Sequence, residues 1–502
     1  MGKYLLAHDI GTSGNKASLF TVEGELVKST VASYQVYYRE GGRAEQNPED
    51  WWKAVCVSTR KVTEGILAEE ILAVSFSAQM QCCLVVDREG KVLRPAVIWA
   101  DQRAQKQTDW LRESLGDAYA YELLGHRLSP TYSMEKLMWI RDNEPEIYEK
   151  TYKMLQVKDY IIYRMTGEFV TDYSDASGTN ALDLEGLCWS KEVLEAAGVP
   201  SDKFPELHAS TDVIGTLQAE AAGELGLTVN TKVVCGGGDG PCSALGAGCI
   251  EKNQMFLTFG TSAWIGGTAE KKFLDNDQVF FCFAHVIPGR YMPCGTMQSA
   301  GSAYSYARNL FCREEIAQAR AQGFSNWDLV NPMAAGSPAG AKGLLFLPYL
   351  TGERAPRWNP DASGSFLGIR MYHKREDYMR AVLEGVAMNL ELILQSYRKY
   401  LNIDRLIMTG GGAKGILWLK SFLMYWKRSW YVRTMWKRRP PLRRQSLQAW
   451  DAGFMRILVP YTNFLHLANR FSRILRKKEI YHKSKRIFDE AYYALKPLYE
   501  RM

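Results

Sequence analysis

The sequence has ten cysteines but no C-x-x-C pair and no Cys/His spacing typical of a zinc site. It contains no run of about 18 apolar residues that could span a membrane. The apolar stretch before His8 and Asp9 is too short for the core of a signal peptide. We therefore expect a cytoplasmic location, reduced thiols without disulfides, and no binding to membranes.

Two widespread catalytic motifs are also missing. Without a G-x-x-x-x-G-K-[ST] sequence, the chain cannot bind a nucleotide through a P-loop. Without a G-x-S-x-G sequence, it has no nucleophile elbow of the hydrolase type. The seven histidines are spread singly, so we interpret each as a surface or core residue.

The positive charge of the chain is concentrated in one segment. The formal net charge is +7, yet residues 414–478 contain 16 lysines and arginines against one acid, Asp451, so the rest of the chain carries −8. A basic surface that binds phosphate backbones should belong to a recognisable module. None is visible, and nucleic acid is therefore not an expected partner.

The remaining composition is that of a soluble globular protein, with 46% hydrophobic and 23% charged residues. A length of 502 residues predicts two or more domains. β-prone segments alternate with helical ones, which predicts an α/β architecture. A helix should begin at Asn47-Pro48, and residues 84–99 have the pattern of a hairpin. The expected strands are 4–7, 16–22, 71–76, 231–235, 255–259, 344–347 and 406–408.

Three glycine-containing turns directly follow predicted strands. They are Asp9-Ile10-Gly11-Thr12-Ser13-Gly14, Phe259-Gly260-Thr261-Ser262 and Gly410-Gly411-Gly412-Ala413-Lys414. Glycine lets the backbone approach a phosphate or a flat base, and a leading aspartate can hold Mg²⁺. Each turn alone is common, but three in this order indicate a nucleotide site. Because such turns occur near the start of the chain and again past its middle, we expect two similar α/β lobes with a cleft between them.

A fourth glycine-rich segment, Gly236-Gly237-Gly238-Asp239, places a carboxylate at the end of a predicted strand. Phosphoryl transfer passes through a loose transition state, so its catalysis consists mostly of positioning and charge neutralisation. A carboxylate within hydrogen-bond reach can accept the proton of the attacking hydroxyl. Asp239 is therefore the candidate general base.

Together these motifs resemble those of the FGGY carbohydrate kinases, members of the actin-like ATPase superfamily with two ribonuclease-H-like lobes. The resemblance covers nearly all of residues 3–415. Stretches between the motifs that agree with it include Trp99-Ala100-Asp101-Gln102-Arg103, Thr171 to Thr179, Leu347 to Pro356, and Gly364 to Ile369. The resemblance implies an enzyme that uses Mg²⁺ and transfers the γ-phosphate of ATP to a hydroxyl of a small sugar. A homodimer is compatible with it.

The resemblance also assigns roles to individual residues. Asp239 would be the general base and Asp9 the Mg²⁺ ligand. The phosphates of ATP would meet Gly11, Thr12, Ser13, Lys16, Gly260 and Thr261, and the adenosine would meet Gly411, Gly412 and Ala413. The sugar would face Gln79, Met80, Gln81, Asp101 and Asp239. The implied domains are an N-terminal lobe, 1–247, with the sugar and phosphate side and the catalytic aspartate near its end, and a C-terminal lobe, 248–502, on the ATP side.

Within the family the resemblance leans towards the xylulokinases, through Gln79-Met80, residues 99–103 and residues 350–354. This implies that the substrate is D-xylulose and the product D-xylulose 5-phosphate. The chain departs from that pattern with Gln81, where xylulokinases usually have His, and with Gly240, where they usually have Asn. Changing one polar partner can shift substrate preference strongly. Gluconate, ribulose, L-xylulose and glycerol therefore stay open as substrates.

Residues 415–473 do not follow the family pattern. They contain five of the 14 tryptophans and a basic run, Lys437–Arg444, with Asp451 as the single acid. With permissible codons the DNA of this stretch can be read in a shifted frame as an Ala- and Gly-rich amphipathic helix. A regular amphipathic pattern returns at Ile487–Leu495. We therefore interpret 415–473 as frame-shifted, non-native sequence that exposes apolar surface and weakens stability and activity.

Two readings compete with an active sugar kinase. One is a non-catalytic, actin-like nucleotide-binding protein, which Asp239 argues against because a sensor needs no sugar-facing base. The other is a pseudokinase that results from the altered segment 415–473.

Overall fold

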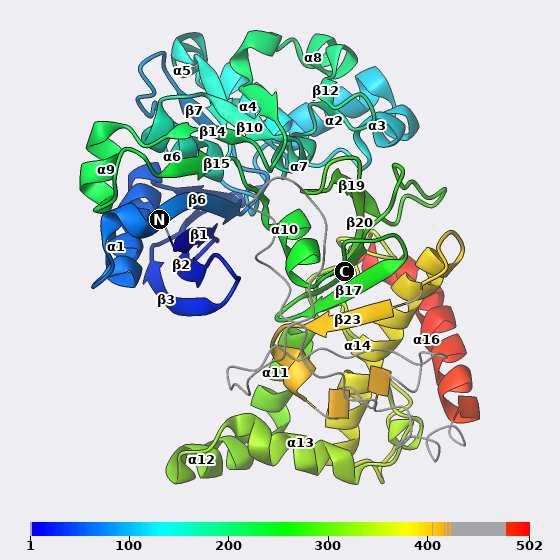
Figure 1. Ribbon diagram of the computed structural model, residues 1–502. Coiled ribbons are helices and arrows are strands. Elements are labelled where there is room, and N and C mark those ends of the chain that lie inside the picture. Colours follow the sequence, from blue (N-terminus) through cyan, green and yellow to red (C-terminus); the bar gives the residue numbers. More distant parts are fainter. Residues whose placement is uncertain (1–2, 404, 416, 419–420, 423–477) are drawn as a thin grey trace.

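The computed structural model describes residues 3–403, 405–415, 417–418, 421–422 and 478–502 (Figure 1). The interpretation of 415–473 as frame-shifted therefore falls mostly outside the described residues. The described chain forms two α/β lobes, which confirms the predicted fold class.

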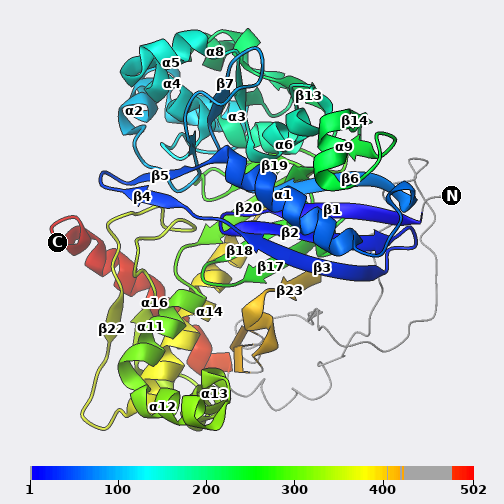
Figure 2. The same cartoon turned by 90° about the vertical axis from the view of Figure 1, so that its left-hand side faces the viewer.

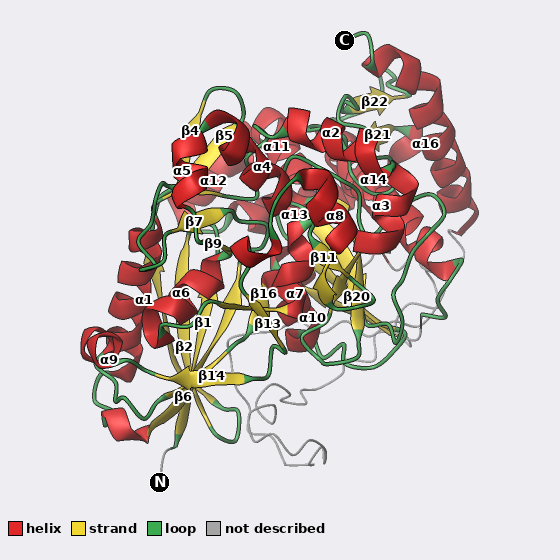
Figure 3. Ribbon diagram, turned by 90° about the horizontal axis from the view of Figure 1, so that it is seen from above, coloured by secondary structure: helices red, strands yellow, loops and turns green. Residues whose placement is uncertain are grey.

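The first lobe is built on a mixed sheet. Its strands are β1 (Tyr4–Ile10), β2 (Gly14–Thr21), β3 (Leu26–Ser33), β6 (Ile71–Ala78), β14 (Val213–Thr216), β15 (Lys232–Val234) and β16 (Gly237–Gly238). Their order is β14-β15-β6-β1-β2-β3, and β16 pairs with β6. Helices α1 (Pro48–Thr63), α6 (Val157–Thr166) and α9 (Ala219–Leu225) pack together on one face of this sheet (Figure 3).

Helix α1 shows how local sequence places an element against this sheet. The Asn47 side chain accepts a hydrogen bond from the Glu49 N–H, and Pro48 occupies the first helical position, so the helix begins where it was predicted. Trp51 and Trp52 then lie on the inner side and are almost completely buried in the core of the first lobe. Burying a large aromatic side chain in this way stabilises the lobe by roughly 2–3 kcal/mol.

The second lobe repeats the central arrangement of the first. Its main strands are β17 (Gln254–Phe259), β18 (Ala263–Gly267), β19 (Phe281–Ala284), β20 (Tyr291–Met297) and β23 (Arg405–Thr409). They lie in the order β19-β20-β18-β17-β23, and helices α11 (Gly301–Phe311) and α14 (Arg375–Arg398) pack beside them. In each lobe a strand pairs antiparallel with the next strand and parallel with a later one: β1 with β2 and β6, and β17 with β18 and β23.

A helical region connects the two lobes. It comprises α2 (Gln105–Leu115), α3 (Asp117–Leu124), α4 (Ser133–Asn143), α5 (Pro145–Lys150) and α8 (Lys191–Ala197). Figure 2 shows these helices at one end of the molecule, with α12 (Arg313–Gln322) and α13 (Asn326–Gly336) at the other. The region bonds to the second lobe through the Cys282 N–H, which donates to the Gly125 carbonyl at 2.7 Å, and the Tyr121 hydroxyl, which donates to Asp275 at 2.8 Å.

The sequence pattern and the structure agree on the strands and differ on one hairpin. All seven predicted strands are present, with ends displaced by at most three residues. Residues 84–99, however, form only the isolated bridges Val86↔Val92 and Cys83↔Val97. Strand β7 (Leu84–Val86) pairs with β9 (Lys153–Leu155), and β8 (Ala96–Val97) pairs with β5 (Arg43–Gln46). The predicted hairpin is therefore present only in part, as these antiparallel bridges, and each of its arms also pairs with a more distant strand.

The remaining strands form short pairs. These are β4 (Tyr37–Arg39) with β5, β10 (Val170–Asp172) with β13 (Glu206–His208), β11 (Leu182–Asp183) with β12 (Cys188–Trp189), and β21 (Leu345–Leu347) with β22 (Ser365–Leu367). The ten cysteines, all within the described residues, form no disulfide. None of the helices in the described ranges is long and apolar enough to cross a membrane.

Helix α16 (Lys478–Tyr499) returns to the second lobe after the segment that is not described, and it contains the predicted helical residues 487–495. Tyr481 and Phe488 are buried against the core of that lobe. The Arg380 guanidinium donates to the Tyr481 hydroxyl at 3.0 Å, and that hydroxyl donates to Glu384 at 2.8 Å. The C-terminal helix is therefore an integral part of the second lobe.

Substitution of Phe488 by alanine should test this docking. Because Phe488 is fully buried, we expect Phe488→Ala to lower the free energy of unfolding by about 3–5 kcal/mol. The neighbouring Ile487 is 42% exposed, so Ile487→Ala should change it by less than about 0.5 kcal/mol. Chemical denaturation of both variants gives the comparison, and equal effects would show that α16 does not pack on the lobe.

Candidate active site

Strand pairing brings Asp9 and Asp239 to the same edge of the first sheet. Asp9 lies near the end of β1, directly opposite Ser77 of β6. Gly237 of β16 pairs with the same Ser77 from the other side. Asp239 follows β16 and begins α10 (Asp239–Gly246). Since neighbouring strands lie about 4.8 Å apart, the two carboxylates are separated by roughly two strand spacings.

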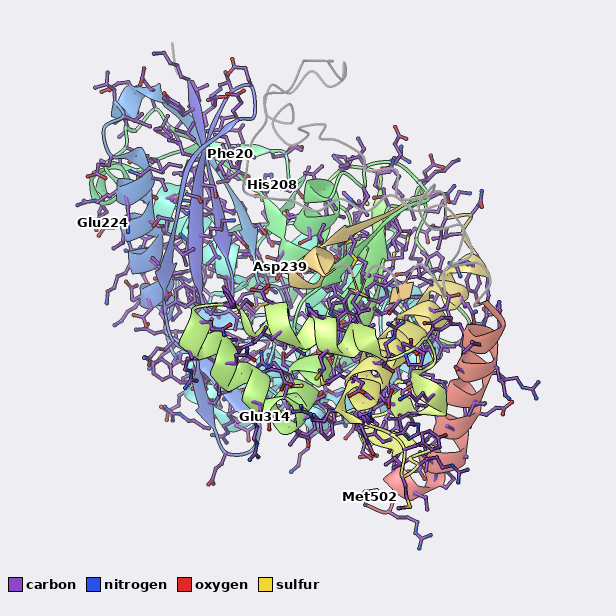
Figure 4. The ribbon with its side chains drawn as sticks, turned by 90° about the horizontal axis from the view of Figure 1, so that it is seen from below. Phe20, His208, Glu224, Asp239, Glu314 and Met502 are labelled. Atoms are coloured by element: carbon purple, nitrogen blue, oxygen red, sulfur yellow. The ribbon has the colours of Figure 1, made fainter. Side chains whose placement is uncertain are left out.

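Asp239 has the electrostatic character of a base that works near neutral pH. Figure 4 shows it between the strands of the first sheet and the elements of the second lobe. Its side chain is accessible to solvent, although protein atoms surround it closely. These surroundings, and then the negative charge of Asp9, raise the pKa of Asp239 to about 7. A carboxylate in this state can both hold and release a proton at physiological pH.

Asp9 is also closely surrounded by protein, but neighbouring groups oppose the resulting rise of its pKa. Close packing raises its pKa, while the charge of Lys16 and a hydrogen bond from Ser77 act in the opposite direction. Lys16 is the residue of β2 that faces Asp9 across the antiparallel pair. Lys16 is thus close to Asp9, and its contact with the phosphates of ATP stays a prediction.

The carboxylate of Asp9 is suited to a divalent cation. A positive charge bound there would offset the negative charge that contributes to the raised pKa of Asp239. Across the residues that the structure describes, no group of three or more His, Cys, Asp or Glu side chains forms a metal cluster. Mg²⁺ suits such a site, because it is usually held by one or two carboxylates together with substrate phosphates and water.

The first predicted phosphate turn connects β1 and β2. The Gly11 N–H donates to the Gly14 carbonyl at 3.1 Å and closes the turn. A Cβ on Gly14 would lie 2.7 Å from the Ala32 carbonyl oxygen, so only glycine fits there. Ser13 is exposed at the tip of the turn.

The hydroxyl of Thr12 in this turn is oriented by a tryptophan. The Trp99 indole N–H donates to Thr12 Oγ1 at 2.9 Å. Because an indole N–H can only donate, Thr12 Oγ1 acts as the acceptor and its own proton stays available for a phosphate oxygen. Trp99 was noted in the sequence only as part of residues 99–103, and nothing in the local pattern pointed to Thr12.

The other two predicted turns lie side by side in the second lobe. Strands β17 and β23 run parallel, with Thr258 opposite Thr409, so the turns that follow them share one sheet edge. Gly260 and Thr261 are both exposed. Their carbonyls accept hydrogen bonds from the Gly301 N–H at 3.0 Å and the Ala300 N–H at 3.1 Å, which fixes the turn to the start of α11.

The triple-glycine turn depends on close approach to Phe259. Gly410 has a positive φ of 86°, and a Cβ on it would lie 2.4 Å from the Phe259 carbonyl oxygen. A Cβ on Gly412 would lie 1.7 Å from the Phe259 ring. Gly411 is exposed with nothing within 4 Å of a Cβ position, while Ala413 is buried behind it. Gly411 is therefore the part of this turn that offers bare backbone to a ligand.

Three predicted sugar-facing residues follow β6 and have different environments. Gln79 is buried and donates to Gln46 at 2.8 Å, while its own Oε1 has no hydrogen-bond partner. Met80 packs against β16, since a Cβ on Gly238 would lie only 2.6 Å from the Met80 sulfur. Gln81 is partly exposed and adopts a positive φ of 63°, an unusual backbone state that is enriched at functional sites.

Gln81 is held by two residues that the sequence analysis did not single out. Its carbonyl accepts a hydrogen bond at 2.7 Å from the ammonium of Lys136, which is completely buried. Its side chain bonds to Tyr132. The sequence analysis made no prediction for the stretch that contains Lys136.

Asp101 is the most deeply buried of the predicted sugar-facing residues. Its carboxylate is completely buried and accepts from the Ala44 N–H at 2.6 Å and from the Arg103 guanidinium at 2.7 Å. Glu45 lies 2.8 Å from the same guanidinium. In this arrangement Asp101 stabilises the loop that carries Trp99.

The site therefore combines a carboxylate base, a second carboxylate suited to a cation, and three turns that present backbone and hydroxyl donors. Comparison with known proteins agrees with this composition. Residues 4–246 match the N-terminal domain of the FGGY family of carbohydrate kinases, and residues 255–422 match its C-terminal domain.

Individual relatives support the same assignment. The gluconokinase of Bacillus subtilis is 34% identical over 420 residues, 83% of this chain and 82% of the relative. The xylulose kinase of the same organism is 31% identical over 421 residues, 83% of this chain and 82% of the relative. The ligand-bound xylulose kinase from Lactobacillus acidophilus superimposes with a TM-score of 0.84 at 25% identity, covering 99% of both chains.

The predicted resemblance and the predicted actin-like, two-lobe fold are thereby confirmed. The chain belongs to the FGGY family of carbohydrate kinases.

Proposed function

We propose that this carbohydrate kinase transfers the γ-phosphoryl group of ATP to a hydroxyl of D-xylulose and forms D-xylulose 5-phosphate. The observation that carries the proposal is the position of Asp239. It directly follows β16, whose Gly237 pairs with Ser77 on the side away from Asp9, and its pKa is raised to about 7 by the surrounding protein and by Asp9. A base in this position serves phosphoryl transfer to an alcohol.

In this proposal each residue of the site performs a separate task. Asp239 orients the sugar hydroxyl and accepts its proton as the bond to phosphorus forms. Asp9 would hold Mg²⁺, which neutralises charge on the phosphates when bound. The hydroxyl of Thr12, oriented by Trp99, donates to a phosphate oxygen. The backbone at Gly260 and Gly411 supports the nucleotide from the second lobe, and approach of the lobes would exclude water as a competing acceptor.

D-Gluconate is the second candidate substrate. The relatives named gluconokinase and xylulose kinase match this chain at similar identities, 34% and 31%. The leaning towards xylulose rests on Gln79-Met80 and residues 350–354, while Gln81 and Gly240 depart from the xylulokinase pattern. Gly240 directly follows the proposed base, and Gln81 follows Met80, which packs against Gly238. One altered hydrogen bond to a substrate changes discrimination by 10-fold or more, on the order of 10⁴-fold at the extreme.

Release of ADP with Mg·ATP and a panel of D-xylulose, D-gluconate, D-ribulose, L-xylulose and glycerol should identify the substrate. We expect the highest kcat/KM with D-xylulose. Asp239→Asn should lower kcat by about 10²-fold or more, because the amide cannot accept the hydroxyl proton. A preference for gluconate would replace the proposed sugar, and an unchanged kcat in Asp239→Asn would contradict the role of the base.

The pH dependence of kcat/KM should report the ionisation of Asp239. Since only the deprotonated carboxylate accepts a proton, kcat/KM should rise with pH below about 7 and level off above it. Asp239→Asn should lose this step. A profile that is flat from pH 5 to 8 would show that another group acts as the base.

The same ionisation has an effect on stability that is measurable without substrate. The pKa of Asp239 is about 7 in the folded chain and near 3.8 when unfolded, so the folded state binds more protons between these values. Stability contributed by this group is therefore lost as pH rises towards 7. Asp239→Asn should have a higher Tm than the parent at pH 8 and about the same Tm at pH 4. Equal values at both pH values would contradict the raised pKa.

We also propose the domain division at 247/248 and the frame shift over 415–473. The match to the C-terminal family domain ends at residue 422, close to where the basic, tryptophan-rich sequence begins, which supports the second proposal. Sequencing of the gene should reveal a compensating pair of insertions or deletions on either side of this segment. An unbroken, verified frame would contradict the frame shift and make the basic segment native.

A further inference from the structure

A buried charged cluster lies directly behind the strand that carries Asp239. The Lys158 ammonium lies 2.6 Å from Asp159, 3.0 Å from Asp172 and 3.6 Å from Asp175. All four side chains are completely buried. Burial acts to lower the pKa of Lys158, but the carboxylates outweigh it and raise that pKa well above its ordinary value, so the ammonium stays charged.

One serine, Ser174, connects this cluster to β16, the strand that precedes Asp239. The Ser174 hydroxyl donates to Asp172 Oδ2, and the same hydroxyl oxygen accepts from the Gly238 N–H at 3.0 Å. Gly238 immediately precedes Asp239. Lys158, Asp172 and Ser174 therefore form a continuous series of polar contacts that ends on the backbone of the proposed base.

The same strand has no room to move sideways. A Cβ on Gly237 would lie 2.7 Å from Ser174 Oγ, and a Cβ on Gly238 would lie 2.6 Å from the sulfur of Met80. On its third side β16 pairs with Ser77 and Ala78 of β6. The hydrogen bond from the Gly238 N–H to Ser174 adds to these contacts. Together they fix the position of the backbone immediately before Asp239.

We propose that Ser174 is a positioning residue, whose hydroxyl, oriented by Asp172 and Lys158, fixes the backbone immediately before Asp239. This inference rests on the proposed function of Asp239 as the general base. The Ser174 hydroxyl proton is directed to Asp172, so a lone pair faces the Gly238 N–H. Polarisation along such a chain strengthens each bond. A displacement of about 1 Å in a catalytic group can lower the rate by about 10²-fold, which makes this bond important for catalysis.

A second serine provides a matched control. The Ser210 hydroxyl donates to the same Asp172 oxygen at 2.6 Å, but it makes no contact with the Gly238 N–H among the bonds of the described residues. Its backbone carbonyl bonds to the Gly236 N–H and is retained in an alanine variant. Ser174→Ala and Ser210→Ala therefore each remove one hydroxyl donor from the same oxygen of Asp172. Only Ser174→Ala also removes the acceptor of the Gly238 N–H.

The test compares these variants in kinetics and in hydrogen exchange. We expect Ser174→Ala to lower kcat by about tenfold or more with KM for sugar and ATP changed by less than about twofold, and Ser210→Ala to keep kcat within about twofold. Ser174→Thr, which keeps the hydroxyl, should recover much of the rate. Equal losses in both alanine variants, or none in Ser174→Ala, would overturn the proposal.

Hydrogen–deuterium exchange of the peptide containing Gly236 to Gly238 gives a result that does not depend on turnover. It should be faster in Ser174→Ala than in Ser210→Ala or the parent, and equal rates would overturn the proposal. A parent without sugar kinase activity would contradict the proposed function instead, and the exchange comparison would then decide on Ser174 by itself. Thermal unfolding should show a larger decrease in Tm for Ser174→Ala than for Ser210→Ala, because both remove one donor from the same buried carboxylate but only Ser174→Ala also leaves the buried Gly238 N–H without its acceptor.

Discussion

The repulsion between Asp9 and Asp239 is the interaction on which the rest of the site depends. Burial and then the charge of Asp9, on the other side of one strand, raise the pKa of Asp239, and neither residue can shift freely because Asp9 belongs to β1 and Asp239 directly follows β16. The core of the first lobe, from the strands to Trp51 on α1, maintains this geometry. The stored electrostatic energy is what makes the site receptive to a cation and its phosphates.

The second constraint is close approach of backbone to backbone. In both lobes a parallel pair of strands ends at a turn that only glycine can form, at Gly14 beside Ala32 and at Gly410 and Gly412 beside Phe259. These glycines serve packing as much as ligand binding, since of the triple glycine only Gly411 has nothing within 4 Å of a Cβ position. A glycine-rich turn thus has an inner part that fits the fold and an outer part that faces a ligand.

Around the ligand-facing groups, buried polar residues determine how each group is oriented. Trp99 directs the Thr12 hydroxyl, Lys136 holds the Gln81 carbonyl, and the contacts from Lys158 reach the strand before Asp239. Buried ions such as these are unfavourable unless their partners are well placed. Their presence beside the site, within rigid helices and strands, indicates that orientation is an important contribution of this fold to phosphoryl transfer.

The sequence by itself determined the α/β class, the seven strands, the start of α1, and the aspartate and glycine turns, because each of these follows from local periodicity and turn chemistry. Tertiary structure decided the pairing of residues 84–99, the complete burial of Asp101, and the contacts of Lys136 and Ser174. The pKa of Asp239 also belongs to this second group, since Asp9 lies 230 positions earlier in the chain. Such properties depend on distances between residues far apart in sequence, and only the folded chain sets those distances.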